Sequence, residues 1–530
     1  MKADFTRDTF DPLKHFSRVV MQQGRVQLDA DWNEQTAILL HTIRRLASDL
    51  LGSNPNPDGG FLPTPIPKRT DDFEIAAGSF YVDGILCEAG ASPVAILTLD
   101  TAANTAVVAQ WTVDGVSFQP GQTLRLTDDA APAAKSTVVA TITRADYDTR
   151  LLTFDIPLTP LKDAALPRAR RLITYLGQPD LPKPPALPAA GAAPVQLYLD
   201  VWERLVTPLE DDSIREVALN GADTADRARV VWQVKALPLS EGADATVCLT
   251  SDQIGLQLRG GPPGLLRARV RQGKAPTDPC TVPPGSSYRG TENQLYRVEV
   301  NTGSDSPAGA APSFKWSRDN GSVIFAVTAV APAASTTTVT LASLGRDERF
   351  GLVEGDYVEL QDDQSLASLL PAQLLRVQAI DRTRMTVVLD GAIGSTVSTN
   401  ASLHPLLRRW DHGVAAATPD GPQPIADGAM QILPGLISGG DTAWLALEDG
   451  LEILFEDLAV TRYQTGDFWL IPARVATGGV LWPQETANDS KGNPVTNPVA
   501  RPPHGPVHHY APLAIRDGTL KIVKCAAPKK

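Results

Sequence analysis

The sequence predicts a mainly β protein with several small β-sandwich or β-barrel modules in tandem and one N-terminal amphipathic helix. Most of the chain consists of short alternating apolar and polar runs separated by turn residues, which is typical of strands. Gly and Pro are frequent, at 41 and 44 of 530 residues, as many turns require. Because 530 residues exceed what one core organises, we expect roughly three or four domains.

The helix follows a polar arm within residues 5–51. Apolar residues recur there at spacings of three, four and seven, which places them on one side of a helix. These residues are Trp32, Leu39, Ile43, Leu46 and Leu50. We expect this stripe to be shared between the protein's own first sheet and a partner subunit.

Asp29 and Asp31 begin this helix, and either can cap its first turn. Together with Asn33 they also resemble the start of a calcium loop. However, Glu34 stands where that loop requires glycine, and Leu40 where it requires a bidentate glutamate. A helix cap is therefore the better interpretation.

Composition and turn signals divide the chain into six parts. Residues 178–194 are proline-rich and are expected to form an extended linker that buries nothing. The parts are an arm and docking helix (1–52), a β domain with a first small barrel (53–177), the linker (178–194), a central β-rich domain (195–328), a second small barrel (329–400) and a C-terminal β domain (401–530).

A pattern G-x-x-[LV]-x-L-x-D-D occurs twice, at residues 121–129 and 355–363, with near-equal spacing to the following strands. We interpret the two regions as copies of one small all-β module. Two dipeptides with the chemistry of tight turns, Asp83-Gly84 and Asn320-Gly321, separate further pairs of strands.

Charge and hydropathy exclude several partners. The formal net charge of −12 disfavours nucleic acid, because phosphate binding needs a basic face. No stretch approaches the roughly 18 consecutive apolar residues of a membrane helix, so membrane insertion is not expected. The N-terminal residues lack the apolar core of an export signal. We therefore expect synthesis in the cytoplasm without a signal peptide.

The four cysteines, Cys87, Cys248, Cys280 and Cys525, are far apart and form no C-x-x-C motif. This pattern favours reduced thiols over a disulfide framework. A Cys248–Cys280 pair remains an alternative.

Catalytic and metal-binding motifs are weak throughout the chain. His504, His508 and His509 are the most ligand-like cluster, with His412 or Asp411 as a further ligand. Their proline-rich surroundings indicate a loop in which histidines cap backbone groups or pack beside an aromatic residue. We therefore predict no metal and no cofactor.

Glu452 and Glu456 have the spacing of a glycosidase carboxylate pair, but a solvated strand face is the default interpretation, because Leu451, Ile453 and Phe455 supply the buried face. The sequence contains no nucleophile elbow, P-loop or Rossmann glycine pattern. It predicts no catalytic residues and a protein that is not an enzyme.

Several segments resemble a known family. FSRVVMQQGRVQLDADWNEQ is similar to the N-terminal signature of phage-tail-like proteins, and IAAGSFYVDGILCE resembles the strand pair that follows it in tail-fibre and baseplate proteins. With YRGTENQLYRVEV, FKWSRDNGSVIF and GDFWLIPAR, the chain resembles an uncharacterised domain family encoded beside extracellular contractile injection systems.

This resemblance implies a non-enzymatic structural or adaptor subunit of a contractile particle, at the baseplate, fibre attachment or cap. Its partners would be other particle subunits, with a homo-oligomer as a further expectation, and the particle would be released from the cell. The alternative is a carbohydrate-recognising fibre, or a glycan-acting enzyme or cargo, using Glu452 or His508.

The arm and helix are the predicted docking surface. Arm residues order on binding, and an amphipathic helix presents its apolar side to a groove. The predicted partner-binding residues are Phe5, Phe10, Phe16, Arg18, Gln23, Arg25, Trp32, Leu39, Ile43 and Leu46.

Overall fold

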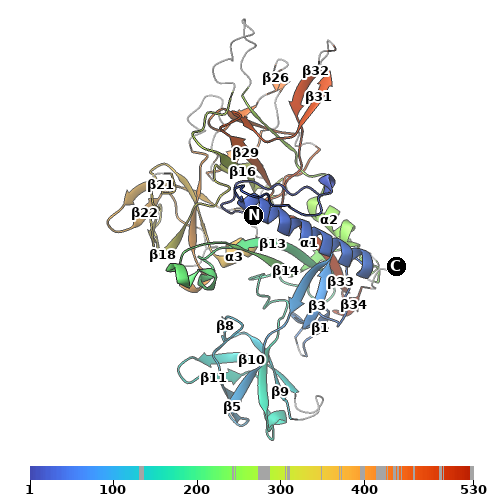
Figure 1. Ribbon diagram of the computed structural model, residues 1–530. Coiled ribbons are helices and arrows are strands. Elements are labelled where there is room, and N and C mark those ends of the chain that lie inside the picture. Colours follow the sequence, from blue (N-terminus) through green and yellow to red (C-terminus); the bar gives the residue numbers. More distant parts are fainter. Residues whose placement is uncertain are drawn as a thin grey trace. The chain divides into compact units, whose positions relative to one another are not determined.

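The computed structural model is mainly β, as predicted (Figure 1). It describes residues 1–525 except 68, 131–136, 241–243, 245, 272–286, 305, 307–310, 348, 369–370, 372, 394–399, 414–424, 426–427, 434–436, 439–440, 443, 457–459, 489–491 and 493. The chain forms two compact units, each assembled from separate stretches. Unit 1 comprises Met1–Thr42, Trp202–Val231 and Gly255–His508; unit 2 comprises Ile43–Val201, Trp232–Ile254 and His509–Lys530.

The predicted N-terminal helix is α1, Asp29–Leu51, and it continues from unit 1 into unit 2. Within the described residues, no helix is long and apolar enough to cross a membrane. The other helices are short: α2 (Ser251–Arg259), α3 (Asp363–Ser368) and the 3-10 turns η1 (Pro12–Lys14), η2 (Thr159–Leu161), η3 (Asp212–Ile214), η4 (Val217–Leu219) and η5 (Ala401–Leu403).

Unit 2 contains the first predicted barrel, which is closed and six-stranded. Its apolar side chains alternate inward and form a core that includes Leu124, Leu126 and Leu152. The strands are β5 (Val94–Asp100), β6 (Thr105–Val108), β9 (Thr123–Asp128), β10 (Thr137–Asp146), β11 (Leu151–Phe154) and β12 (Pro167–Arg171).

Unit 1 contains the second predicted barrel, also closed and six-stranded. Its core includes Val358, Leu360 and Val387. The strands are β18 (Ile324–Pro332), β19 (Thr337–Leu341), β20 (Tyr357–Gln361), β21 (Leu374–Asp381), β22 (Thr386–Leu389) and β23 (Leu406–Trp410).

The two barrels share one topology. When β5, β6, β9, β10, β11 and β12 are matched in sequence order to β18–β23, the strands follow the same cyclic order in both. The first strand pair has a bulge in each copy, at Ile96/Thr98 and at Val327/Ala329. The repeated glycine donates its N–H to the equivalent strand in each, Gly121 to Ile142 O and Gly355 to Val377 O. The structure therefore bears out the internal repeat.

The rest of unit 1 is built on two sheets whose side chains share one core, which includes Tyr296, Trp316, Ile453 and Trp469. The first sheet has the order β24-β17-β16-β29-β30 and the second β15-β28-β27. Their bounds are β15 (Leu266–Val270), β16 (Gln294–Thr302), β17 (Ser313–Ser317), β24 (Met430–Gln431), β27 (Leu445–Ala446), β28 (Leu451–Phe455), β29 (Phe468–Arg474) and β30 (Gly479–Val480).

A further sheet has the order β14-β13-β33-β34, of which β13 and β14 run from one unit into the other. Its bounds are β13 (Val195–Val206), β14 (Arg227–Pro238), β33 (His509–Arg516) and β34 (Ile522–Lys524). Small two-stranded ribbons complete the fold: β1 (Pro63–Pro65) with β2 (Phe73–Ile75), β3 (Gly78–Val82) with β4 (Ile85–Ala89), β7 (Thr112–Val113) with β8 (Val116–Ser117), β25 (Ile437–Ser438) with β26 (Asp441–Thr442), and β31 (Gln484–Asn488) with β32 (Pro494–Pro498).

Residues 178–194 contain no helix or strand, but they are not a free linker. Gln178 is buried, and its side chain donates to Val234 O at 2.9 Å and accepts from Val234 N at 2.6 Å. Leu181 is buried as well. The expectation that this segment buries nothing is wrong, because its proline-rich backbone packs within unit 2.

Candidate docking surface on the N-terminal arm and helix α1

Asn320 fixes the start of the arm in unit 1. Its side-chain amide donates hydrogen bonds to Met1 O at 3.0 Å and to Ala3 O at 2.8 Å. Asn320 and Gly321 have φ angles of 52° and 67°, as expected for the predicted turn. This turn connects β17 to β18, which belong to different sheets, so it is not a hairpin.

Phe5, which was expected to meet a partner, faces the protein's own core. Its ring packs against Leu295, Phe468 and Leu470. Partial burial of this aromatic ring stabilises this part of the arm. The contact of Phe5 with a partner stays a prediction.

A buried charge cluster around Glu299 contacts the start of the arm at Lys2. Its carboxylate pairs with Lys2 at 2.8 Å, with Arg297 at 2.6 Å and with Lys315 at 3.6 Å. Lys315 also pairs with Glu359 at 2.9 Å. Burial alone would raise the pKa of Glu299, but the three cations hold it below its ordinary value. Burial lowers the pKa of Lys2 to about 8, against the opposing charges of Glu299 and Glu359.

The arm then runs along the first half of α1 and is tied to it by side chains. Phe10 lies against His41, with ring centroids 5.5 Å apart, so it too faces the protein. Hydrogen bonds supply the remaining ties: Thr6 N to Asp29 Oδ2 (2.7 Å), Thr9 Oγ1 to Glu34 Oε2 (2.6 Å) and Val19 N to Gln35 Oε1 (2.8 Å).

The two predicted helix caps have different roles in the structure. Asp29 accepts from Thr6 of the arm, whereas Asp31 reaches back to Leu28 N at 3.3 Å. The second contact resembles half of a capping box, in which a side chain in the first turn satisfies the amide that precedes the helix. Both aspartates therefore organise the start of α1, but through the arm and the residue before the helix, which differs from the predicted cap on the free amides of the first turn.

The outer part of the arm is open to solvent. Phe16 is 58% exposed, and Arg18, Gln23 and Arg25 are exposed as well. Five further apolar residues share this exposure: Leu13, Val20, Met21, Val26 and Leu28. Apolar side chains gathered in this way are unusual on a monomer surface and typical of an interaction site.

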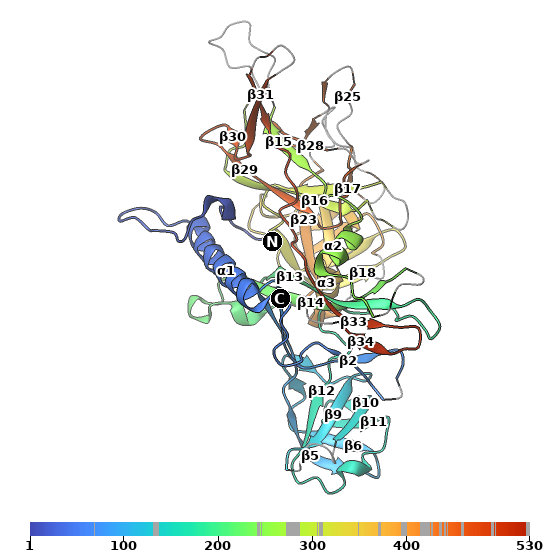
Figure 2. The same cartoon turned by 90° about the vertical axis from the view of Figure 1, so that its right-hand side faces the viewer.

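The predicted apolar stripe of α1 is also exposed. Trp32 is 76% exposed, Ile43 60% and Leu50 64%, and Leu39 and Leu46 are more than half exposed. The buried residues of α1 are Ala30 and Ile38, on the opposite side of the helix. The stripe is thus not shared with the protein's own first sheet, which corrects that expectation. Figure 2 shows the course of the arm and α1.

The inner side of the second half of α1 contacts the β3–β4 turn within unit 2. A Cβ on Gly84 would lie 2.1 Å from Arg44 O, and Gly84 has a φ of 80°. The turn matches the predicted Asp-Gly hairpin, since β3 pairs with β4 across it. Glycine therefore allows the turn to approach the helix backbone.

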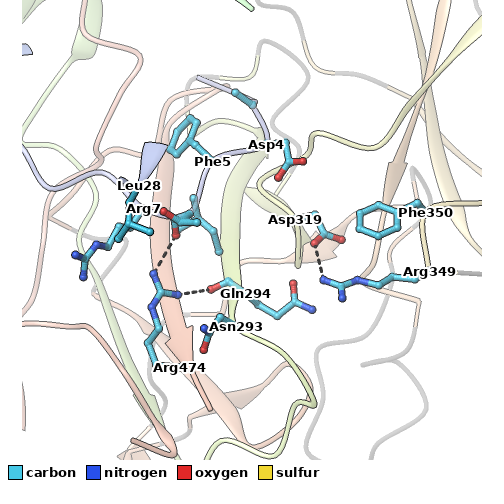
Figure 3. Close-up of a pocket in the computed structure, with 13 residues that line it drawn as sticks. Asp4, Phe5, Arg7, Leu28, Asn293, Gln294, Asp319, Arg349, Phe350 and Arg474 are labelled. Atoms are coloured by element: carbon cyan, nitrogen blue, oxygen red, sulfur yellow. Dashed lines mark hydrogen bonds and ion pairs between the residues drawn. The ribbon is translucent and has the colours of Figure 1, made fainter. Parts of the chain in front are cut away.

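A cavity of about 340 Å³ lies in unit 1 beside residues 3–7 of the arm (Figure 3). Arg474 reaches its wall and donates to Thr6 O at 3.0 Å and to Gln294 O at 3.2 Å. Asp319 lies opposite, 3.5 Å from Arg349, and burial raises its pKa to about 6. Both guanidinium groups thus bind other groups of the protein itself. Through Arg474, the wall of the cavity holds the arm in place.

The histidines of the predicted loop have separate partners. His504 accepts from Leu470 N at 3.0 Å, His508 lies against Trp202 with centroids 4.9 Å apart, and His509 bonds Asp83. Desolvation of the ring, together with the nearby charges of Arg501 and Arg297, lowers the pKa of His504 to about 4. In the part of the chain that the structure describes, no three His, Cys, Asp or Glu side chains form a metal site.

The two strand glutamates form ion pairs. Glu452 is buried and contacts Arg269 at 3.0 Å and Arg271 at 2.9 Å, so it does not belong to a solvated face. Glu456 pairs with Arg267 at 2.6 Å. Each carboxylate is thus bound by at least one arginine of the protein itself.

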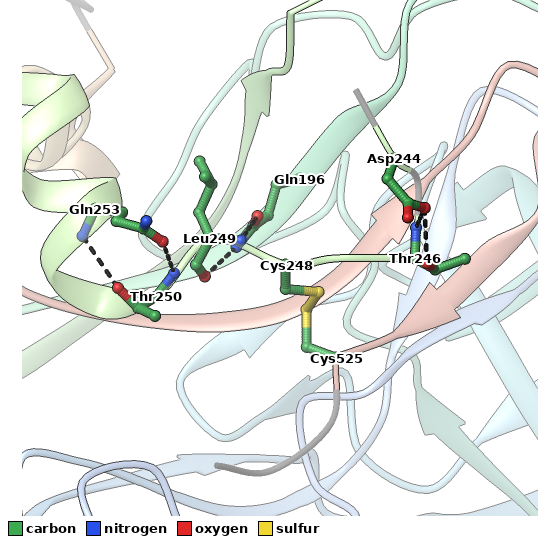
Figure 4. Close-up of a disulfide and its surroundings, with 8 residues drawn as sticks. All are labelled: Gln196, Asp244, Thr246, Cys248, Leu249, Thr250, Gln253 and Cys525. Carbon is green, nitrogen blue, oxygen red and sulfur yellow. Dashed lines mark hydrogen bonds between the residues drawn. A yellow bond between two sulfur atoms is a disulfide. The ribbon is translucent and has the colours of Figure 1, made fainter. Parts of the chain in front are cut away.

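A disulfide joins Cys248 to Cys525 within unit 2, with a Cα–Cα distance of 5.8 Å (Figure 4). The expectation of reduced thiols is wrong for these two cysteines, and so is the alternative pairing of Cys248 with Cys280. Cys280 itself lies outside the described residues. Cys87 is free and buried, and burial raises the pKa of its thiol to about 12.

The sequence did not predict the residues that hold the arm. Lys2, Glu299 and Asn320 are brought together from three distant segments, and only the turn signal at Asn320 was visible in the sequence. A charged residue such as Lys2 in a polar N-terminal segment is expected to be solvated. Its burial depends on the tertiary structure.

A protein-family model described as a family of unknown function (DUF6519) matches residues 1–123, 189–261 and 256–527. The three matched stretches cover the arm, α1 and most of both units. No curated protein matches the sequence significantly.

Proposed function

Because the chain belongs to the family of unknown function DUF6519, we propose its role from its surface: a non-enzymatic assembly or adaptor subunit of a contractile, phage-tail-like particle. The observation that carries the proposal is the exposure of many apolar side chains on the outer arm and on α1. The resemblance of residues 16–35 to phage-tail-like proteins supplies the kind of particle.

Two further features support a docking role. The arm is held at its start by a buried charge cluster, in which Lys2 pairs with Glu299. Anchoring one end of a segment lowers the entropy cost of its binding. The disulfide fits a protein that functions in an oxidising environment, as a particle released from the cell would.

The alternative role, as a carbohydrate-recognising or glycan-acting protein, draws less support. Glu452 is neutralised by two arginines, and His508 packs on Trp202. Both side chains already have partners within the protein, so we give preference to the assembly role.

Co-purification tests the proposal. An affinity-tagged full chain, expressed with the neighbouring particle genes, should bring sheath and tube proteins with it, as identified by mass spectrometry. Replacing Phe16 and Val20 together by serine should reduce that recovery at least tenfold. Leu219→Ser is the matched control, because Leu219 is an exposed apolar residue outside the arm. Particles that assemble without the chain, or an arm variant that behaves as the control does, would refute the proposal.

A further inference from the structure

Residues 16–28 of the arm form a projecting loop, here called the arm loop, which appears in Figure 2 as a narrow blue loop beyond the N-terminal end of α1. Its two legs are residues 16–22 and 25–28, and neither contains a helix, turn or bend. One turn joins them, in which Arg25 N donates to Gln22 O at 3.3 Å. Val19 is half-buried and all the other residues of the loop are exposed. The arm loop is thus an extended segment that is mostly open to solvent.

The turn explains why the two legs do not pair with each other. Gly24, the third residue of the turn, has a φ of 70°, whereas Gln23 before it does not have a positive φ. This combination is the signature of a type II turn. Turns of types I and II splay the strands that they join, because their twist does not match that of a hairpin. The legs accordingly form no ladder, and their main-chain groups stay available.

Main-chain hydrogen bonds are almost absent from the first leg. Val19 N donates to Gln35 Oε1 at 2.8 Å, and apart from the turn no other main-chain hydrogen bond occurs in residues 16–22 of the described chain. In extended chain, successive residues direct their N–H and C=O groups to opposite edges. Because Val19 faces α1, Arg18 and Val20 direct these groups to the outer edge. The first leg therefore presents an unpaired strand edge.

The side chains of the first leg suit a strand as well. Val19 and Val20 are β-branched, and Val20 is 69% exposed. Such residues favour strands, and an exposed apolar strand edge pairs readily with another chain. Addition of an extended segment to the open edge of a sheet satisfies its main-chain groups and buries alternate side chains. This binding mode matches both features of the leg.

The charge of the segment indicates the kind of edge that it fits. Residues 12–28 contain Lys14, Arg18 and Arg25 and no Asp or Glu, although the whole chain has a net charge of −12. Two arm loops of identical copies would place cations against cations, which disfavours their pairing with each other. Carboxylates on a neighbouring strand would instead complement both arginines. The complementary surface is therefore an acidic one.

We propose that the first leg of the arm loop adds as a strand to the open edge of an acidic β-sheet in another subunit of the particle. The main-chain groups of Arg18 and Val20 pair with that edge, and Arg18 and Arg25 select carboxylates on it. This inference rests on the proposed function and adds the way in which the arm binds and the kind of partner that it fits.

A comparison of Val20→Pro with Val20→Ala tests the main-chain contact. Both changes remove the valine side chain, but only proline removes the N–H group. Tagged full chains are expressed with the neighbouring particle genes, and the recovered sheath and tube proteins are quantified by mass spectrometry. Val20→Pro should recover at least tenfold less of them than Val20→Ala. Equal recovery by the two variants would overturn the proposal.

Charge reversal tests the acidic character of the partner. Arg18→Glu with Arg25→Glu should lower the recovery at least tenfold. Arg170→Glu with Arg382→Glu is the matched control, because both arginines are exposed and lie outside the arm, and it should leave the recovery unchanged. An equal effect of the two double variants would overturn the assignment of an acidic edge.

Photo-crosslinking identifies the strand directly. A photoreactive amino acid in place of Val20 should cross-link, in the assembled particle, to a strand of another subunit with Asp or Glu beside the linked residue. Cross-links only to a second copy of this chain would overturn the inference. If the natural chain recovers no sheath or tube, the proposed function and this inference both fail. If it recovers them and Val20→Pro behaves as Val20→Ala does, only the inference fails.

Discussion

Glu299 offers the most direct test of how the arm is held. The substitution Glu299→Gln keeps the size of the side chain and removes its charge. Lys2, Arg297 and Lys315 then lose their shared anion, and both Arg297 and Lys315 are 4% exposed. Because breaking a buried ion pair leaves an uncompensated charge, we expect a loss of about 3–5 kcal/mol in the stability of unit 1.

Amide hydrogen exchange measures this loss locally. Peptides from β16 should exchange roughly a hundredfold faster or more in the variant, since about 1.4 kcal/mol corresponds to a factor of ten. Glu485→Gln is the control, because it removes a half-exposed partner of Arg267 at 3.4 Å and should cost less than about 1 kcal/mol. Equal exchange in the two variants would refute the reasoning.

The same carboxylate predicts a pH dependence. The pKa of Glu299 in the folded protein lies below its ordinary value of 4.5. Its stabilisation is therefore fully present above about pH 4.5 and is lost as the pH falls through the folded pKa. Exchange of β16 should accelerate in acid more steeply in the natural protein than in Glu299→Gln, after correction for intrinsic exchange. Parallel pH profiles would contradict this assignment.

Three further predictions concern other contacts. Cys525→Ser should destabilise unit 2 by about 2–5 kcal/mol, because it removes the disulfide to Cys248. A reductant should lower the melting temperature of the natural protein but not that of the variant. An equal effect of the reductant on both proteins would argue against this disulfide. Gly84→Ala should lower the free energy of unfolding by more than about 1 kcal/mol, because its Cβ would meet Arg44 O. Amide hydrogen exchange in the second half of α1 should become faster. Unchanged exchange would show that the turn does not support the helix. Asn320→Gly keeps the left-handed turn but removes the hydrogen bonds to Met1 O and Ala3 O. Trypsin should therefore cleave the arm faster in this variant. A cleavage rate equal to that of the natural protein would contradict the anchoring role of Asn320.

Local patterns predicted much of the fold. The spacing from Trp32 to Leu50 predicted α1, the Asp83-Gly84 pair predicted the β3–β4 turn, and the repeated glycine motif predicted two barrels. Each of these features depends on residues close together in the chain, so periodicity and turn chemistry determine them.

The contacts that were not predicted join residues far apart. Cys248 and Cys525 are separated by 277 positions, and spacing alone cannot pair them. Gln178 looked like part of a solvated linker because its neighbours are prolines, yet its amide bonds Val234 in a buried strand. Burial of the arm likewise depends on partners from distant strands.

The two barrels also show which positions of this module can diverge. Arg125 and Glu359 are equivalent, each four residues after the repeated glycine, and they carry opposite charges. Arg125 pairs with Glu74 at 2.6 Å in unit 2, whereas Glu359 pairs with Lys315 in unit 1. Both barrels keep the same strand order around apolar interiors. An ancestral duplication could therefore reverse the charge on the outside of the barrel, and so change what each copy packs against, while the interior preserved the fold.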